Sequence, residues 1–100
     1  MSVTETVIFK IKPNKTELAQ SVRKRSLDYI LKNYPGIISI EALHTADDAS
    51  VFMDLCRWES LESAKSAAEK AMTDPNLTTY FETIESVLFT GHFLTEGDQK

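Results

Sequence analysis

The order of hydrophobic and polar residues along the chain predicts four strands and two helical segments. Alternation of apolar and polar positions predicts strands over residues 6–12, 36–44, 50–58 and 86–94. Apolar residues spaced three and four apart predict helices over residues 15–33 and 61–84. The predicted order of elements is therefore β-α-β-β-α-β.

Residues that begin and end helices fall at the expected boundaries. Asn14 followed by Glu17 forms a capping-box pattern, and Pro35–Gly36 ends the first helix. Ser60 is the expected cap of the second helical segment, and Asp74–Pro75 is expected to restart that helix after residue 72.

This order of elements is that of a ferredoxin-like α+β domain. We expect an antiparallel four-stranded sheet, in the order 4-1-3-2, with both helices on one face. A chain of 100 residues has room for one domain, with a core over about residues 4–95 and a polar tail over 96–100.

Strand alternation predicts which residues face the helices. We expect the floor of the helix-covered side to consist of Val7, Phe9, Ile40, Met53 and Phe89. Opposite this floor lies a stripe of alanines that includes Ala67. Small side chains either let helix and sheet pack closely or leave an apolar pocket for a flat ligand, and both interpretations stay open.

The opposite face of the predicted sheet is also apolar. Its expected members are Ile8, Ile37, Leu43, Phe52, Cys56, Trp58, Leu88 and Leu94. An apolar surface of this size is costly to leave in water, so the sequence predicts a homodimer packed sheet to sheet through a two-fold axis.

Charge and cysteine content exclude several classes of function. The formal net charge is −4 and the pI is about 5.1, which disfavours a nucleic-acid binder. No stretch approaches the roughly 20 apolar residues of a membrane helix, and the first residues have no targeting pattern. One cysteine permits no disulfide within the chain and suggests the cytoplasm. Two histidines and one cysteine on separate elements give no metal-ligand spacing, so no metal is expected.

Two tyrosines are candidates for binding a substrate. Tyr29 and Tyr80 are expected to point from the two helical segments toward the sheet, where their hydroxyls would hydrogen-bond a phenol or an enolate. The plainer interpretation is that both are core aromatic residues with hydroxyls at the rim.

His92 is a candidate general base. The predicted strand order places it with Lys10, Asp54 and Thr90 on the dimer-facing side, where a carboxylate–imidazole pair would form. The plainer interpretation is a polar patch that fixes the dimer register, with Lys10 and Asp54 as an ion pair. The basic run 23–25 is interpreted as a solvated helix face, in which Lys24 pairs with Asp28.

Four motifs carry a resemblance to a known family. They are Lys12–Lys15, Tyr34–Ile37, Arg57–Ser63 and Asp74–Pro75. With these motifs the chain resembles the dimeric α/β-barrel superfamily, and within it the small antibiotic-biosynthesis-monooxygenase-like domains. The resemblance covers about residues 4–95 and implies a pocket between sheet and helices in each subunit.

The resemblance argues against haem degradation. Haem-degrading members use an Asn, a Trp and a His, and the corresponding positions here are Val7, Ala67, and Tyr80 or Phe81. Quinone-forming members hold a phenolic substrate without metal or flavin. This chain keeps candidate hydroxyls at Tyr29 and Tyr80 but lacks their Asn.

The leading functional hypothesis is a cofactor-independent monooxygenase-like enzyme for a small electron-rich aromatic or polyketide-like substrate. Tyr29 and Tyr80 would orient the substrate, which would itself supply the electrons to oxygen. Two alternatives stay open: a non-catalytic ligand-binding or stress-related module of the same fold, and an isomerase or decarboxylase with His92 as its base.

Overall fold

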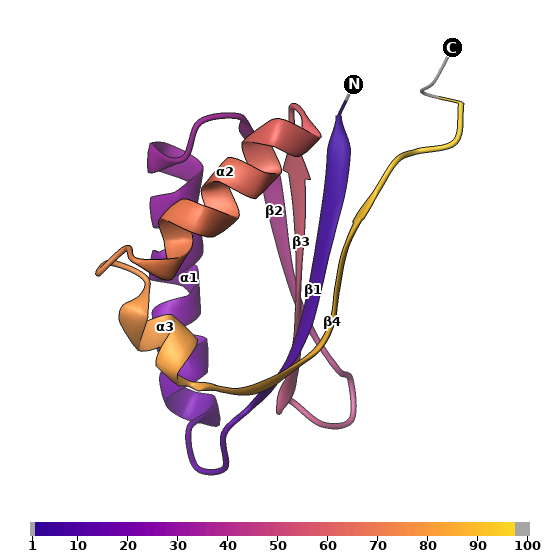
Figure 1. Cartoon of the computed structure of the whole chain (residues 1–100). Coiled ribbons are helices and arrows are strands. Elements are labelled where there is room, and N and C mark those ends of the chain that lie inside the picture. The colour runs from indigo at the N-terminus through magenta and orange to yellow at the C-terminus, as the bar shows by residue number, and fades with distance from the viewer. Residues whose placement is uncertain (1, 98–100) are drawn as a thin grey trace.

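A computed structural model describes residues 2–97 of the chain (Figure 1). Its elements are β1 (Val3–Ile11), α1 (Thr16–Asn33), β2 (Ile37–His44), β3 (Val51–Trp58), α2 (Leu61–Met72), α3 (Thr78–Glu82) and β4 (Ile84–Phe93). The four strands form one sheet in the order β2-β3-β1-β4, and all neighbouring strands are antiparallel. The predicted ferredoxin-like fold is confirmed, with the short α3 as the restarted part of the second helical segment.

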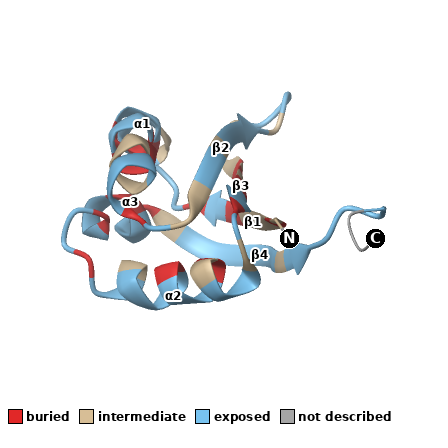
Figure 2. Ribbon diagram, turned by 90° about the horizontal axis from the view of Figure 1, so that it is seen from above, coloured by how far each residue is buried: buried red, intermediate tan, exposed pale blue. Residues whose placement is uncertain are grey.

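The helices lie on one face of the sheet, and the other face is bare (Figures 1 and 2). In Figure 2 the buried positions of the helices face inward, whereas β4 is exposed along most of its length. β4 is an edge strand that the helices barely cover, which leaves its helix-side groups within reach of solvent.

The core consists of two clusters between the helices and the sheet. In the first, Phe9 lies edge-on to Phe52 and Tyr80, with ring centroids 5.8 and 6.0 Å apart. In the second, Ala64 and Ala67 of the alanine stripe are buried in one cluster with Trp58 and Leu77. The alanines therefore serve close packing in this cluster.

The predicted faces of β3 are inverted. Met53 was expected to face the helices but lies on the bare side, while Phe52, Asp54, Cys56 and Trp58 face the helices and are buried. Because both faces of β3 are apolar, alternation alone could not decide its orientation. The register with β1, which sets Phe52 opposite the buried Phe9, decides it.

A bulge in β4 inverts the second half of that strand. Phe9 is opposite Val87 and Ile8 is opposite Phe89, so Leu88 is the extra residue. Phe89, expected on the pocket floor, therefore faces the bare side. Thr90 and His92, expected on the dimer-facing side, lie on the helix side.

A similar irregularity occurs at the start of β2. Ile37 is opposite Trp58 and Ser39 is opposite Arg57, so Ile38 is extra. Ile37 consequently packs into the second core cluster, and Ile38 is exposed. Ile40 keeps its expected place on the helix side, packed against both clusters.

The helix caps predicted from the sequence are confirmed only in part. The Ser60 hydroxyl accepts a hydrogen bond from the Ser63 amide at 3.1 Å, which confirms that cap. Asn14 does not cap α1; it adopts a left-handed conformation, φ 66°, in the preceding turn. Asparagine tolerates this conformation better than most residues, which explains its use there.

Candidate functional site

The three predicted catalytic residues do not converge on one point. Tyr80 belongs to a buried network with Arg23 and Asp54, Tyr29 lies beside Asp74, and His92 lies beside Glu5. Each of these polar clusters has its own chemistry; Tyr80 is buried, whereas Tyr29 and His92 are partly exposed.

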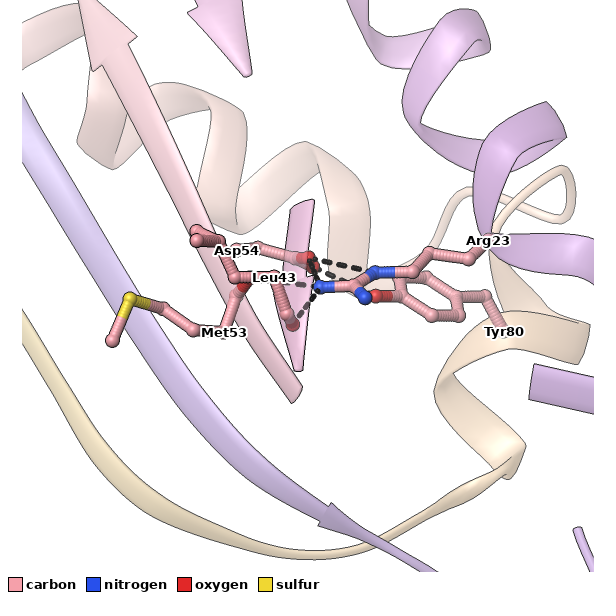
Figure 3. Close-up of polar contacts among 5 residues, drawn as sticks. All are labelled: Arg23, Leu43, Met53, Asp54 and Tyr80. Carbon is pink, nitrogen blue, oxygen red and sulfur yellow. Dashed lines mark hydrogen bonds and ion pairs between the residues drawn. The ribbon is translucent and has the colours of Figure 1, made fainter. Parts of the chain in front are cut away.

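Arg23 is the centre of the first cluster (Figure 3). Its guanidinium contacts the Asp54 Oδ1 atom at 2.6 Å through Nη2 and at 3.1 Å through Nε. Nη2 also donates to the carbonyl oxygens of Leu43 and Met53, at 3.0 and 2.8 Å. The guanidinium lies 4.2 Å from the centroid of the Phe52 ring. This ion pair ties α1 to the β2–β3 hairpin.

Tyr80 completes this network by donating its hydroxyl hydrogen to Asp54 Oδ2 at 2.8 Å. Its side chain is buried, and burial together with the Asp54 carboxylate raises the pKa of Tyr80 well above the ordinary value of 10.0. The hydroxyl is therefore a fixed neutral donor, and its hydrogen is already bound within the protein.

Two predictions about this region are wrong. Arg23 is buried, although it was interpreted as part of a solvated run; only its neighbour Lys24 makes the expected exposed pair with Asp28, at 2.9 Å. Asp54 faces the helices and pairs with Arg23, whereas Lys10 lies on the other side of the sheet. Arg23 lies on the buried stripe of α1, and the inverted orientation of β3 places Asp54 against it.

Asp74 is the centre of the second cluster. It accepts hydrogen bonds from the Tyr34 hydroxyl at 2.8 Å, the Tyr29 hydroxyl at 3.4 Å and the Asn76 amide at 3.0 Å. Burial acts to raise the pKa of Asp74, but these hydrogen bonds outweigh it and lower the pKa below its usual value. The cluster fixes the α2–α3 connection against the end of α1.

Glu5 and His92 form the third cluster, on the helix side of the sheet. They are opposite each other on β1 and β4, and the His92 Nε2 atom lies 3.5 Å from Glu5 Oε2. The His92 side chain is 30% exposed, and that of Glu5 is 15% exposed. Thr90 and Val7, opposite each other in the same register, occupy the same side of the sheet.

Trp58 fixes the other oxygen of this carboxylate. Its indole Nε1 donates to Glu5 Oε1 at 3.0 Å, and its own side chain is buried. Cys56 lies opposite Glu5 on β3, and burial together with the Glu5 and Asp54 charges raises the pKa of its thiol to about 12. A charged carboxylate is thus held between a buried indole and an accessible imidazole.

Sequence reasoning missed Glu5 because the first strand was expected to start at Thr6. The strand starts at Val3, and its helix-side row then contains one acidic residue between Val3 and Val7. An acidic residue in a row that is otherwise apolar was the available signal. Arg23 had a similar signal, since it lies four residues from both Ala19 and Leu27 on the buried stripe of α1.

Surface grooves also occur along the helices. One of about 390 Å³ runs between α1 and β2, with Leu27, Leu31 and Ile40 among its lining residues and Lys24 and His44 at its polar positions. His44 is exposed, as expected, and its Nδ1 lies 2.9 Å from the Thr45 carbonyl oxygen. This groove does not include Tyr29, Tyr80 or His92.

Residues 2–97 contain neither a membrane-spanning helix nor a cluster of metal ligands. No helix there is long and apolar enough to cross a membrane. Within the same range, no group of three or more His, Cys, Asp and Glu side chains is arranged to hold a metal ion.

Comparison with known proteins gives a likeness of fold. No family model matches the sequence, and no curated protein matches it. Among solved structures, SnoaB, a cofactor-independent oxygenase from Streptomyces nogalater, superposes with a TM-score of 0.75 at 16% identity, over 95% of this chain and 93% of that one.

Two further structures give the same result. The "putative antibiotic biosynthesis monooxygenase" of Nitrosomonas europaea has a TM-score of 0.78 at 17% identity, over 96% of this chain and 91% of that one. A conserved protein from Methanosarcina mazei has a TM-score of 0.68 at 13% identity, over 93% and 89% of the two chains. The fold expected from the resemblance is therefore confirmed.

Proposed function

We propose that this protein is a cofactor-independent monooxygenase-like enzyme that acts on a small electron-rich aromatic or polyketide-like molecule. The observation that carries the proposal is the His92–Glu5 pair, a partly exposed imidazole beside a carboxylate on the helix side of β4. Such a pair is suited to remove a proton from a weakly acidic substrate. The likeness of fold to SnoaB supports the same class of reaction.

The reaction that we propose needs no external reductant. His92 takes a proton from a phenol or an activated methylene group, and the electron pair stays on the substrate as an anion. The anion supplies electrons to O2; when a CH2 group becomes a carbonyl, one oxygen atom enters the product and the other leaves as water. Atoms and electrons balance with O2 as the only co-reactant.

We propose that the substrate lies on the open helix side of β1 and β4, against Val7 and Thr90. The register places both on the same side as His92. Phe9, Ile40 and Ala67 support this surface from the core. Met53 and Phe89 lie on the bare side of the sheet and are assigned to the dimer interface instead.

Tyr29 and Tyr80 are positioning residues in this proposal. Both hydroxyls donate a hydrogen bond to a carboxylate of the protein, Tyr29 to Asp74 at 3.4 Å and Tyr80 to Asp54 at 2.8 Å. They therefore hold α1, α2 and α3 over the sheet and shape the surface that the substrate meets.

We also propose that two copies form a homodimer through their bare sheet faces. The apolar residues that the register places there are Ile8, Leu43, Val51, Met53, Leu55, Phe89 and Phe93. Leu43, Phe89 and Phe93 are exposed in the single chain, and a two-fold pairing would remove them from water. The lone buried thiol favours a cytoplasmic location.

Oxygen consumption tests the enzymatic proposal. We expect the protein to accelerate O2 uptake by 1,8-dihydroxyanthrone, a probe with phenolic hydroxyls and an acidic methylene, and His92→Gln to lower the rate by about 100-fold or more. His44→Gln is the matched control, because His44 is exposed at the end of another strand. Equal rates in the two variants would exclude His92 as the base.

A second candidate function is binding without catalysis. It is favoured by the engagement of both tyrosine hydroxyls in hydrogen bonds within the protein. In that case native mass spectrometry would find the probe bound to parent and His92→Gln proteins alike, and neither would consume oxygen faster than buffer.

A further inference from the structure

The two carboxylate oxygens of Glu5 have different partners, one on each neighbouring strand. One oxygen accepts the indole hydrogen of Trp58, at 3.0 Å, and the other faces the His92 Nε2 atom, at 3.5 Å. The three side chains form a row across β3, β1 and β4 on the helix side of the sheet. We call this set the Glu5 row.

The Glu5 row becomes more exposed from β3 toward β4. Trp58 is 3% exposed as a residue, the Glu5 side chain is 15% exposed and the His92 side chain is 30% exposed. The rigid end of the row is therefore the indole, and the end that meets solvent is the imidazole. A carboxylate anchored in this way has little freedom to turn away from His92.

We propose that Glu5 is the positioning residue for His92 and that Trp58 locks it in place. Glu5 faces Nε2, so Nε2 carries the hydrogen of the neutral imidazole and Nδ1 is left to accept a proton. This inference rests on the proposed function for the use of that proton, but the coupling between the two side chains is independent of it.

The row also restricts the class of substrate. Proton transfer to Nδ1 creates an imidazolium beside the Glu5 carboxylate, which stabilises it. A substrate that is already an anion would be repelled by Glu5 before reaching His92. The substrate is therefore a neutral C–H or O–H acid that becomes an anion only when His92 takes its proton.

The charged and titratable groups that face the row come from three strands. They are Glu5 on β1, Cys56 on β3 and His92 on β4. The Cys56 thiol stays neutral through the pH range of interest, since its pKa is raised to about 12. Glu5 is thus the acidic group that faces the His92 imidazole in the Glu5 row.

The test is an NMR measurement of the imidazole ¹⁵N shifts, which report the tautomer of both histidines, at one alkaline pH in the parent protein, Glu5→Gln and Glu41→Gln. Glutamine keeps an acceptor for Trp58, so the fold is retained. In Glu5→Gln we expect the share of the His92 tautomer with its hydrogen on Nε2 to fall, because the carboxylate oxygen that faces Nε2 is lost. Glu41 lies on the bare side of β2, so Glu41→Gln is the matched control and should leave His92 unchanged. His44 is an internal control in every sample.

A kinetic measurement accompanies the NMR measurement, with 1,8-dihydroxyanthrone as the probe. Glu5→Gln should lower kcat by about tenfold or more with KM within about twofold, because a positioning residue for the base acts on the transition state. Trp58→Phe should lower kcat less, since the carboxylate keeps its charge but loses its anchor. A change confined to folding would not separate kcat from KM in this way.

The outcomes separate this inference from the proposed function. If the share of the Nε2–H tautomer of His92 changes equally in Glu5→Gln and Glu41→Gln, or in neither, the coupling does not exist and the inference is overturned. If this share falls only in Glu5→Gln but the parent protein does not accelerate oxygen uptake, the positioning role stands and the oxygenase proposal fails.

Discussion

Arg23 and Lys24 are neighbours in the sequence, but α1 places them in opposite environments. Arg23 turns inward to a buried carboxylate, whereas Lys24 pairs with Asp28 in solvent. Removing one partner of a buried ion pair strongly lowers the free energy of unfolding, because the charge that remains is buried without a partner. An exposed pair is screened by water and contributes little.

This contrast predicts different effects of the same substitution at the two sites. Arg23→Met should lower the free energy of unfolding by about 3–5 kcal/mol, since Asp54 stays buried with only Tyr80 as its partner. Lys24→Met should leave it nearly unchanged. Urea denaturation followed by circular dichroism measures both, and equal midpoints would contradict the structural role given to Arg23.

The raised pKa values of three buried groups predict how the free energy of unfolding depends on pH. The pKa of Cys56 is raised to about 12, and burial also raises the pKa values of Tyr34 and Tyr80 well above their ordinary value. These groups stay protonated in the folded protein but ionise in the unfolded chain near pH 9 to 10, so unfolding releases protons above that pH. The stability that they contribute is complete below about pH 9 and is lost as pH rises toward the folded pKa values.

We therefore expect the urea midpoint to be constant from about pH 7 to 9 and to fall from about pH 9 upward. Cys56→Ala should move the onset of this fall toward about pH 10, where unfolded tyrosines begin to ionise. Absorbance of tyrosinate at 295 nm should rise together with unfolding. A rise that precedes unfolding would show that Tyr34 and Tyr80 ionise in the folded protein.

At the scale of elements, the strands and helices were largely predictable from the sequence, and the faces of the strands were not. Phe9 and Ile11 fix the inner face of β1 because the alternate residues Lys10 and Lys12 are charged. β3 has apolar residues on both faces, so only its register with β1 orients it. One extra residue, Leu88, then places Thr90 and His92 on the opposite face of the sheet from the one expected. No local sequence pattern indicates this bulge.

Of the candidate site, the sequence identified the titratable residue His92 but not its partner Glu5. His92 stood out as a titratable residue on the last strand, but it was expected to pair with Asp54 on the dimer-facing side. Both residues lie on the helix side, where Asp54 pairs with Arg23 instead. Glu5 becomes its neighbour through the β1–β4 register, which forms between residues far apart in the sequence. Long-range pairing of this kind has to be seen in three dimensions.

The junction between Gly36 and α2 gives a prediction at the same scale. Gly36 has a φ of 84°, and a Cβ atom there would lie 2.5 Å from the Ser63 hydroxyl oxygen at the start of α2. Gly36→Ala should therefore lower the free energy of unfolding by about 1 kcal/mol or more.

Gly97→Ala is the control for this prediction. Gly97 has a φ of 97°, but a Cβ atom there would have open space within 4 Å. Its effect on the thermal unfolding midpoint should be smaller than that of Gly36→Ala. Equal effects would mean that the close approach of α2 to Gly36 does not matter.

At the scale of the whole molecule, the two faces of the sheet differ in what they contain. The helix side contains the core and the Glu5 row, and the bare side has apolar residues that include two phenylalanines packed across Gly91. The ring centroids of Phe89 and Phe93 are 6.0 Å apart. This apolar surface is the one that the proposed homodimer would bury.

The dimer can be tested by adding one charge to that face. Leu55→Lys places an ammonium group on the bare side of β3 and should convert the dimer to a monomer, with the circular dichroism spectrum retained. Ala68→Lys adds the same charge on an exposed position of α2 and should remain dimeric. Light scattering after size-exclusion chromatography measures both, and a monomeric parent protein would contradict the proposed assembly.

The central claim is that His92, held by Glu5, starts an oxygenation that uses O2 alone. Incubation of 1,8-dihydroxyanthrone with the protein under ¹⁸O2, followed by mass spectrometry of the product, tests it most directly. We predict one ¹⁸O atom in each product molecule formed by the parent protein, and almost no product above the buffer rate with His92→Gln. Product that lacks ¹⁸O, or that forms equally fast with His92→Gln, would contradict the account.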